Sequence, residues 1–293
     1  MVETSRFRIA RYSRPTDEVP SPEEFHEAIG TGNLYEDLRI EGEPYTKTNG
    51  EEIELDYREK VDNSELGTLT DKNGDETEFC KFTYYTDTID SALIRAEGND
   101  GEEEDVRQSV LFVDMYYFEG GLFAFENRNE LEREWLSVYM DEVSGYDLSR
   151  TVEHDSFPQS VMNSFYDVHS DISLLKLRAS DSEDSFTSAR ADGSGGELYS
   201  LLRELGSEEF KSKEKSLSEI SAIDQLVEHS GIDIAKAYGT PEGGVKQEIS
   251  QTGSIALSWG AREWEPLDAA GQTEKVAQSL KPYVLQLKEH YSS

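Results

Sequence analysis

Residues 109–143, SVLFVDMYYFEGGLFAFENRNELEREWLSVYMDEV, contain the densest run of β-branched and aromatic residues in the sequence. Residues 110–125 predict a hairpin whose turn is Glu119-Gly-Gly. Asn129 then has the character of a helix N-cap, and from Leu131 on apolar residues recur at i, i+4, i+7 and i+8, which places them on one helical face. This stretch therefore predicts two buried strands and a helix as the floor of a core.

The rest of the chain predicts more short strands than helices. Ser21-Pro-Glu-Glu is a helix start with a capping-box acid, residues 79–85 and 89–96 predict two strands, and a solvated acidic loop is expected at 97–105. We expect an α+β fold with mostly antiparallel sheets and packed helices. The predicted domains are 1–145, with the central hairpin and helix, and 146–293, with a mobile loop at 181–196 and a closing helix at 273–291.

The net charge is −34, from 28 basic and 62 acidic residues. Such an excess of acids causes strong self-repulsion at ordinary ionic strength, but at about 1 M salt the Debye length falls to roughly 3 Å. The acids are spread over the chain instead of forming one tail. We therefore interpret the charge as adaptation to a halophilic host.

The sequence contains one cysteine and no recognisable signal peptide or membrane span. A single cysteine, Cys80, excludes an internal disulfide and any zinc site built on several thiolates. No signal peptide opens the sequence, and no apolar run approaches the roughly 18 residues of a membrane span. We expect a cytoplasmic protein without contact to a membrane.

Signatures of known catalytic and cofactor chemistry are absent from the sequence. It holds no phosphate-binding glycine loop, dinucleotide fingerprint or nucleophile elbow, and its five histidines are scattered singly. We therefore predict no cofactor, no catalytic residue and no metal site. One alternative stays open, a metal-dependent nuclease strand using Asp75, Glu78 and Lys81.

Acids are scarce near the two ends of the chain. Residues 1–14 carry a net charge of +3, and residues 230–293 carry only −2, so nearly all of the negative charge lies between them. If the first strand and the C-terminal part share a face, that face could contact phosphate. In the alternative interpretation, Arg6 and Arg8 pair with acids on adjacent strands.

Three segments resemble the RexA phage-exclusion proteins and, more loosely, the KwaB-type defence proteins. They are VLFVDMYYFEGGLFAFENRNELEREWL, FKSKEKSLSEI, and the ending from IDIAKAYG through PEGG and VKQEISQTGSIALSWG to the last helix. The resemblance implies a two-domain α+β protein, dimeric, that binds duplex DNA with little sequence preference in antiviral defence or exclusion. It carries over to Lys211, Lys213 and Lys215, in the segment that resembles the basic stretch of the family.

The sequence thus predicts a non-enzymatic DNA-binding defence protein that forms a homodimer. The predicted phosphate contacts are Arg6, Arg8, Arg11, Lys211, Lys213, Lys215, Lys236 and Lys246. The alternatives are a protein-interaction or assembly subunit that recruits a partner through an aromatic surface including Trp259 and Trp264, and the metal-dependent nuclease.

Overall fold

A computed structural model describes residues 3–12, 19–30, 38–41, 45–47, 49–53, 56–70, 74–95, 102–126, 152–154, 156–179, 207–213, 215–228, 232–241 and 245–292. The chain divides into two compact units. Unit 1 combines Met1–Thr16 with Val152–Ser293, and unit 2 is Asp17–Thr151. Both contain antiparallel strands and helices, so the expected α+β character is confirmed, whereas the predicted two-domain division stays a prediction.

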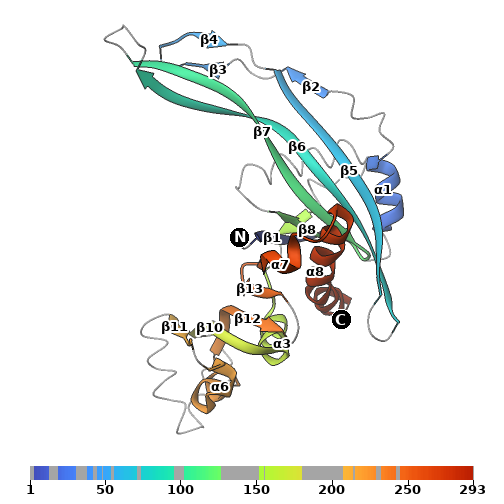
Figure 1. Cartoon of the computed structure of the whole chain (residues 1–293), viewed down its shortest axis with the longest axis vertical. Helices are drawn as coiled ribbons and strands as arrows, with labels where there is room; N and C mark the ends of the chain where they lie inside the picture. The colour runs from blue at the N-terminus through green and yellow to red at the C-terminus, as the bar shows by residue number, and fades with distance from the viewer. Residues whose placement is uncertain are drawn as a thin grey trace. The chain divides into compact units, whose positions relative to one another are not determined.

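Unit 2 is built on long antiparallel strands that run side by side (Figure 1). The order across its sheet is β8-β7-β6-β5-β2. Their bounds are Leu38–Glu41 for β2, Asp56–Thr70 for β5, Glu76–Arg95 for β6, Glu102–Phe118 for β7 and Leu122–Glu126 for β8. A separate small hairpin joins β3, Tyr45–Thr46, to β4, Glu52–Ile53.

The hairpin predicted at residues 110–125 is confirmed as β7 and β8, with Phe118 opposite Leu122. Gly120 and Gly121 both have positive φ, a backbone region that glycine enters without a steric penalty. Two other expectations were wrong. Residues 79–85 and 89–96 belong mostly to one continuous strand, β6, and residues 102–105 of the expected acidic loop are strand. Continuous pairing with β7 extends both strands beyond their apolar portions.

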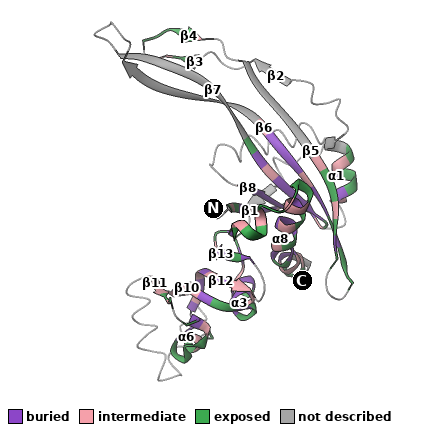
Figure 2. Ribbon diagram, in the orientation of Figure 1, coloured by how far each residue is buried: buried purple, intermediate pink, exposed green. Residues whose placement is uncertain are grey.

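Helix α1, Pro22–Gly30, packs on β5 and β6 and begins with the predicted capping box. The Ser21 backbone N–H donates to Glu24 Oε2 at 2.8 Å, and the Glu24 N–H donates to Ser21 Oγ at 3.1 Å. Phe25 is fully buried and stacks on Tyr117 with ring centroids 4.4 Å apart. Figure 2 shows buried residues along β6, where this aromatic core lies.

Unit 1 contains a second antiparallel arrangement, in the order β11-β10-β12-β13-β14-β1, with β9 also paired to β1. The bounds are β1 Glu3–Tyr12, β9 Val152–His154, β10 His169–Ala179, β11 Ser207–Lys211, β12 Ile232–Pro241, β13 Lys246–Ser250 and β14 Ser254–Trp259. β12 and β13 pair as an antiparallel hairpin. The first strand pairs with β14, so the two ends of the chain meet in this unit.

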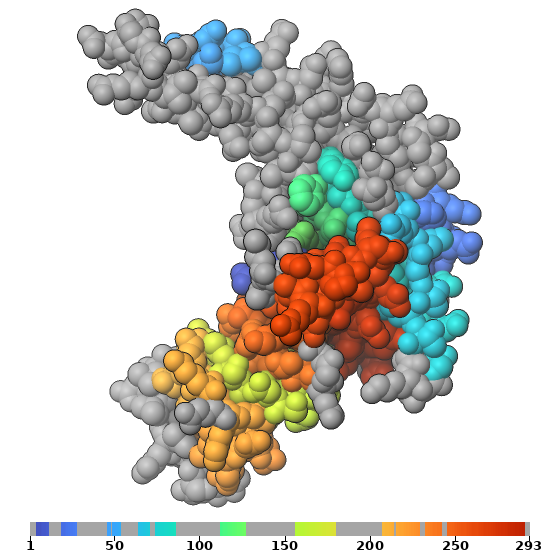
Figure 3. All heavy atoms as spheres, in the orientation of Figure 1, coloured from blue at the N-terminus to red at the C-terminus, as the bar shows by residue number. Residues whose placement is uncertain are grey.

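Helices cover one face of the unit 1 strands. They are α3 at Gln159–Val168, α6 at Ser221–Val227, α7 at Ala261–Trp264 and α8 at Ala269–Ser292, with the 3-10 helix η1 at Leu217–Glu219. Phe165 of α3 and Tyr283 of α8 stack with centroids 6.4 Å apart, and α7 and α8 form one continuous surface in Figure 3. The predicted closing helix is thus confirmed. No helix in the described part of the chain is long and apolar enough to cross a membrane.

Several predictions fall outside the described residues. They are the helix expected from Asn129 on and the loop expected at 181–196.

Candidate nucleic-acid interface

Strand alternation in unit 1 sends apolar side chains toward the helices and polar side chains to the opposite face. On β13, Gln247 and Ile249 are buried, whereas Lys246 and Glu248 are not. The same alternation runs along β1, β10, β12 and β14, with β-bulges in the pairing of β10 with β12. We call the side opposite the helices the polar face. Its described cations are Arg6, Arg8, Lys176, Arg178, Lys211, Lys236 and Lys246, and its described acids are Asp171, Glu209, Asp233 and Glu248.

The register places these residues in rows that run across the strands. One row joins Arg8, Ser254, Ser250, Lys236 and Lys176. Neighbouring strands lie about 4.8 Å apart, so the row brings cations from β1, β12 and β10 onto one surface of roughly 20 Å. Ser254 and Ser250 lie between Arg8 on one side and the two lysines on the other, and they contribute short side chains with hydroxyl groups.

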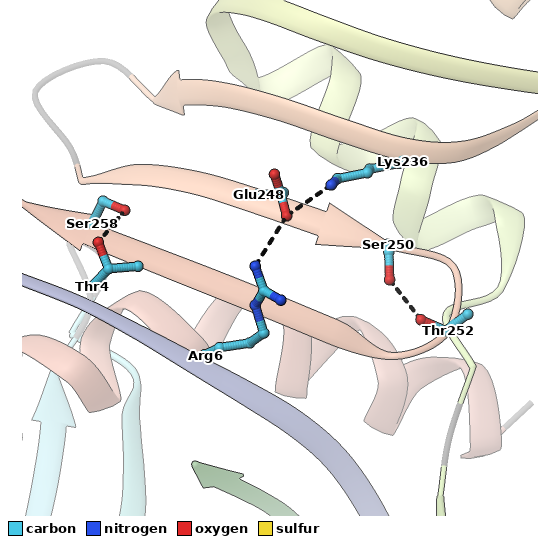
Figure 4. A network of polar contacts seen from close by, with 7 residues as sticks. All are labelled: Thr4, Arg6, Lys236, Glu248, Ser250, Thr252 and Ser258. Carbon is cyan, nitrogen blue, oxygen red and sulfur yellow. Dashed lines mark hydrogen bonds and ion pairs between the residues drawn. The ribbon is translucent and has the colours of Figure 1, made fainter. Parts of the chain in front are cut away.

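A parallel row joins Arg6, Ala256, Glu248 and Tyr238. Ala256 has a short side chain, so the Arg6 side chain can extend over β14 toward β13. Glu248 Oε1 lies 3.8 Å from the Arg6 guanidinium and 3.0 Å from Lys236 Nζ. Figure 4 shows both cations directed at this one carboxylate, flanked by the hydroxyl pairs of Thr4 with Ser258 and of Ser250 with Thr252. Arg6 thus pairs with an acid, as the second interpretation from the sequence expected, but that acid lies two strands away and not on an adjacent strand.

Two lysines are opposed on adjacent strands of this face. Lys176 and Lys236 are direct partners in the pairing of β10 with β12, an arrangement of like charges that opposes strand association. Glu209 lies opposite Lys176 on β11, and its carboxylate is 2.6 Å from Lys211 Nζ. The hydrogen bond from Lys211, aided by the charges of Lys211, Lys236 and Lys176, lowers the pKa of Glu209.

The polar face has an excess of positive charge in a strongly acidic protein. Its seven described cations outnumber its four described acids, whereas the whole chain carries −34. The cations also reach solvent, since 61% of the Arg6 side chain and 66% of the Lys211 side chain are exposed. Such a local surplus can attract an anion that the rest of the surface repels.

Five of the eight predicted contact residues share this face, and three do not. Arg6, Arg8, Lys211, Lys236 and Lys246 lie on it. Arg11 lies opposite Glu153 of β9. It is an even number of residues from the buried Phe7, so it belongs to the face of β1 that lies opposite the polar face. Lys213 and Lys215 are exposed in the segment that follows β11.

Sequence reasoning missed two cations of the face, Lys176 and Arg178. The signal was present in the sequence, because Lys176 and Arg178 alternate with the apolar Leu175 and Leu177, which are buried in β10. The guanidinium of Arg178 lies 3.8 Å from the carboxylate of Asp233 on β12. Isolated cations in an acidic chain become significant only when neighbouring strands show which face they share.

The alternative nuclease residues do not come together. Glu78 and Lys81 are three positions apart on β6, which pairs with β7 without a bulge, so their side chains leave opposite faces. Lys81 Nζ instead lies 3.3 Å from Asp114 Oδ1, and Asp75 precedes the strand. No group of three possible metal ligands exists among the described residues.

Trp259, offered above as part of a partner-binding surface, is a core residue. It is fully buried and stacks on Trp264, which is half-buried, with ring centroids 4.6 Å apart. This tryptophan therefore contributes to the packing of β14 against α7 and is not available to a partner.

Two further polar clusters lie on the helix-covered sides of the sheets. In unit 1, His169 Nδ1 is 2.7 Å from the Phe165 carbonyl and Nε2 is 3.2 Å from Gln247 Oε1, to which the Tyr283 hydroxyl also donates. Burial lowers the pKa of His169, against the opposing effect of its two hydrogen bonds, and burial raises the pKa of Tyr283. Both groups are therefore neutral at pH 7 and serve packing.

In unit 2, Ser64 occupies a bulge of β5 between His26 and Cys80. Its Oγ is 2.5 Å from His26 Nδ1 and 3.7 Å from Cys80 Sγ. Burial raises the pKa of Cys80 to about 11, so the thiol is protonated at neutral pH and is a poor nucleophile. This cluster links α1 to the sheet and offers no activated group.

Against this geometry we compared the chain with known proteins. No protein-family model matches the sequence, and no curated protein is significantly similar to it.

Proposed function

We propose that the polar face of unit 1 binds the phosphate backbone of duplex DNA, with little sequence preference and without catalysis. The observation that carries the proposal is the gathering of seven described cations from β1, β10, β11, β12 and β13 on one face of a chain whose net charge is −34. The resemblance to RexA-type and KwaB-type proteins extends the proposal to antiviral defence or exclusion, with a homodimer as the active form.

The chemistry of the face suits phosphate more than bases. Lys, Arg, Ser and Thr side chains and backbone N–H groups make most contacts to DNA phosphates, and such contacts carry no sequence information. Lys236 and Lys246 supply point charges, and Ser250, Ser254 and Ser258 supply hydroxyl groups between them. No helix among the described elements protrudes from this face to enter a groove, so direct reading of base edges is not expected.

The acidic remainder of the chain restricts how the duplex can approach. DNA carries one charge per roughly 1.7 Å of axis, so it is repelled wherever acids dominate the surface. Only a surface with a local surplus of cations, such as the polar face, lets phosphates approach without that repulsion. The same phosphate contacts weaken as salt rises, with a slope of about −0.9 in log K per log salt for each phosphate. In a halophilic host the ionic contacts therefore have to be supplemented by non-ionic ones, such as hydrogen bonds from the serine hydroxyl groups.

A matched pair of variants tests the proposal. Lys236→Gln with Lys246→Gln removes two cations from the polar face, and Arg262→Gln with Lys275→Gln removes two from helices α7 and α8. Binding of a short fluorescent duplex is followed by anisotropy across a KCl series from low to molar salt. We expect the first pair to weaken binding at least tenfold at low salt and to reduce the salt slope by about 1 for each lysine, with no effect of the second pair.

Two results would overturn the proposal. An equal loss from both pairs would mean that net charge alone matters, and an absence of binding at every salt concentration at which the protein is folded would exclude a DNA-binding face. The second outcome would favour a protein partner. Duplexes of unrelated sequence serve as a further control, since we expect them to bind equally.

A further inference from the structure

Glu248 on β13 pairs with two cations of the polar face. Its Oε1 accepts from Lys236 on β12 at 3.0 Å and faces the Arg6 guanidinium on β1 at 3.8 Å. The described ion pairs of Glu209 and Asp233 join each of them to one cation, Lys211 and Arg178 respectively. Glu248 thus joins cations from two different strands, β12 beside its own strand and β1 two strands away.

The position of Glu248 is central in the cation arrangement. It lies on β13 between Lys246, two residues before it, and the row of Arg8, Ser250 and Lys236. Only a quarter of its side chain is exposed, so the carboxylate lies between the cations and does not project into solvent beyond them. A phosphate that approaches Arg6 and Lys236 therefore meets a negative charge that is already paired with both side chains.

A carboxylate and a phosphate use the same donors of arginine and lysine, so they compete for them. The ion pairs of Glu248 are partly exposed, and such pairs are worth only about 0 to 1 kcal/mol each, so a ligand can displace the carboxylate. A single small anion makes too few contacts to displace the Glu248 carboxylate. A phosphate backbone can, because it contacts Arg8, Lys176 and Lys246 at the same time and gains from all of them.

We propose that Glu248 is a built-in competitor for phosphate at the centre of the polar face. The inference rests on the proposed function and adds regulation of the same site. The carboxylate holds Arg6 and Lys236 in the absence of DNA, lowers the affinity of the face for every anion, and restricts occupancy to polyanions that make several contacts at once. Removal of its charge releases two cations to the ligand.

The test compares Glu248→Gln with Glu209→Gln, which removes an acid whose ion pair is with Lys211, at the β11 edge of the same face. Both variants remove one negative charge, so the change in net charge is matched. Duplex binding is measured by anisotropy in a KCl series, with inorganic phosphate as a competitor in a second arm. We expect Glu248→Gln to tighten duplex binding about three- to tenfold at low salt, and to make the salt slope steeper by up to about 1.8, for two released cations. Glu209→Gln should tighten duplex binding by less than half of the factor expected for Glu248→Gln. Inorganic phosphate should compete measurably with the duplex only in the Glu248→Gln variant.

The outcomes separate this inference from the proposed function. If Glu248→Gln binds no more tightly than Glu209→Gln while loss of Lys236 and Lys246 still weakens binding, the face binds DNA and the inference is wrong. Weaker binding by Glu248→Gln would show that the carboxylate positions the cations, which also overturns it. If no variant binds DNA at any salt, the proposed function and the inference fail together. Glu248→Ser, which matches the small neighbouring serines, replaces Glu248→Gln if that variant does not fold.

Discussion

The two units build similar sheets and use the face opposite their helices differently. In unit 2, β6 and β7 carry Phe79, Tyr116 and Phe118 on that face, and Lys81 is held between Thr83 and Asp114. In unit 1, the corresponding face carries small hydroxyl residues on β13 and β14 and an excess of cations around them.

The difference shows that fold class does not locate the function of this chain. Both units are antiparallel strands covered on one side by helices, and both have aromatic cores. What separates them is the choice of residue at alternate strand positions. Lys81 has a carboxylate and a hydroxyl beside it and is satisfied within the fold. Lys236 has a carboxylate beside it as well, but it shares Glu248 with Arg6 and lies opposite Lys176, so an external anion can add to the interactions of these cations.

The largest expected effect concerns the aromatic core of unit 2. Phe25→Ala removes a fully buried ring that stacks on Tyr117 and contacts Phe123, with centroids 5.8 Å apart. We expect the free energy of unfolding to fall by about 3 to 5 kcal/mol, measured by urea denaturation at high KCl. Phe25→Leu, which keeps most of the apolar volume, should lose less than half of that. A loss below about 1 kcal/mol for Phe25→Ala would mean that α1 does not seal this core.

The next effect distinguishes the units by pH. Burial lowers the pKa of His169 in unit 1 below 6.5, so its contribution is complete above the unfolded value and is lost as pH falls below about 6.5. Burial raises the pKa of Cys80 in unit 2 from 9.0 to about 11, so its contribution is complete below pH 9.0 and is lost as pH rises toward 11. Each group changes stability by at most about 1.4 kcal/mol per pH unit.

Urea midpoints measured from pH 5 to pH 11 check both directions. His169→Gln should flatten the acid limb alone, and Cys80→Ala should flatten the alkaline limb alone. An alkaline limb that Cys80→Ala leaves unchanged would assign it to other groups and contradict the buried position of the thiol.

Much of the local structure could be predicted because its determinants are close in sequence. The hairpin of β7 and β8, the capping box of α1 and the long apolar stripe of α8 all depend on residues within one or two turns or strands. The pairing of β1 with β14 could not be predicted in this way. Thr4 and Ser258 are 254 positions apart and yet share a hydrogen bond, and no local periodicity encodes such a pairing.

The candidate site shows the same division. The shared face of Lys236 and Lys246 follows from alternation in one hairpin, and alternation alone already separates Arg11 from Arg6 and Arg8. The central role of Glu248 depends on Arg6, which reaches it only because β1 joins the C-terminal strands. Composition showed that the two ends of the chain are less acidic, but only the register shows which side chains meet.

The smallest expected effect is also the sharpest test of the contrast between the faces. Lys81→Gln removes the cation 3.3 Å from Asp114, so we expect the free energy of unfolding to fall by about 1 kcal/mol and DNA binding to stay unchanged. Lys176→Gln removes one of two opposed lysines, so stability should stay constant or rise by a few tenths of a kcal/mol, while DNA binding weakens. Urea denaturation and duplex anisotropy on the same preparations give both quantities. If Lys176→Gln destabilises the protein as much as Lys81→Gln and leaves binding intact, Lys176 is a structural partner of Glu209, and the polar face has one cation fewer to offer to a phosphate.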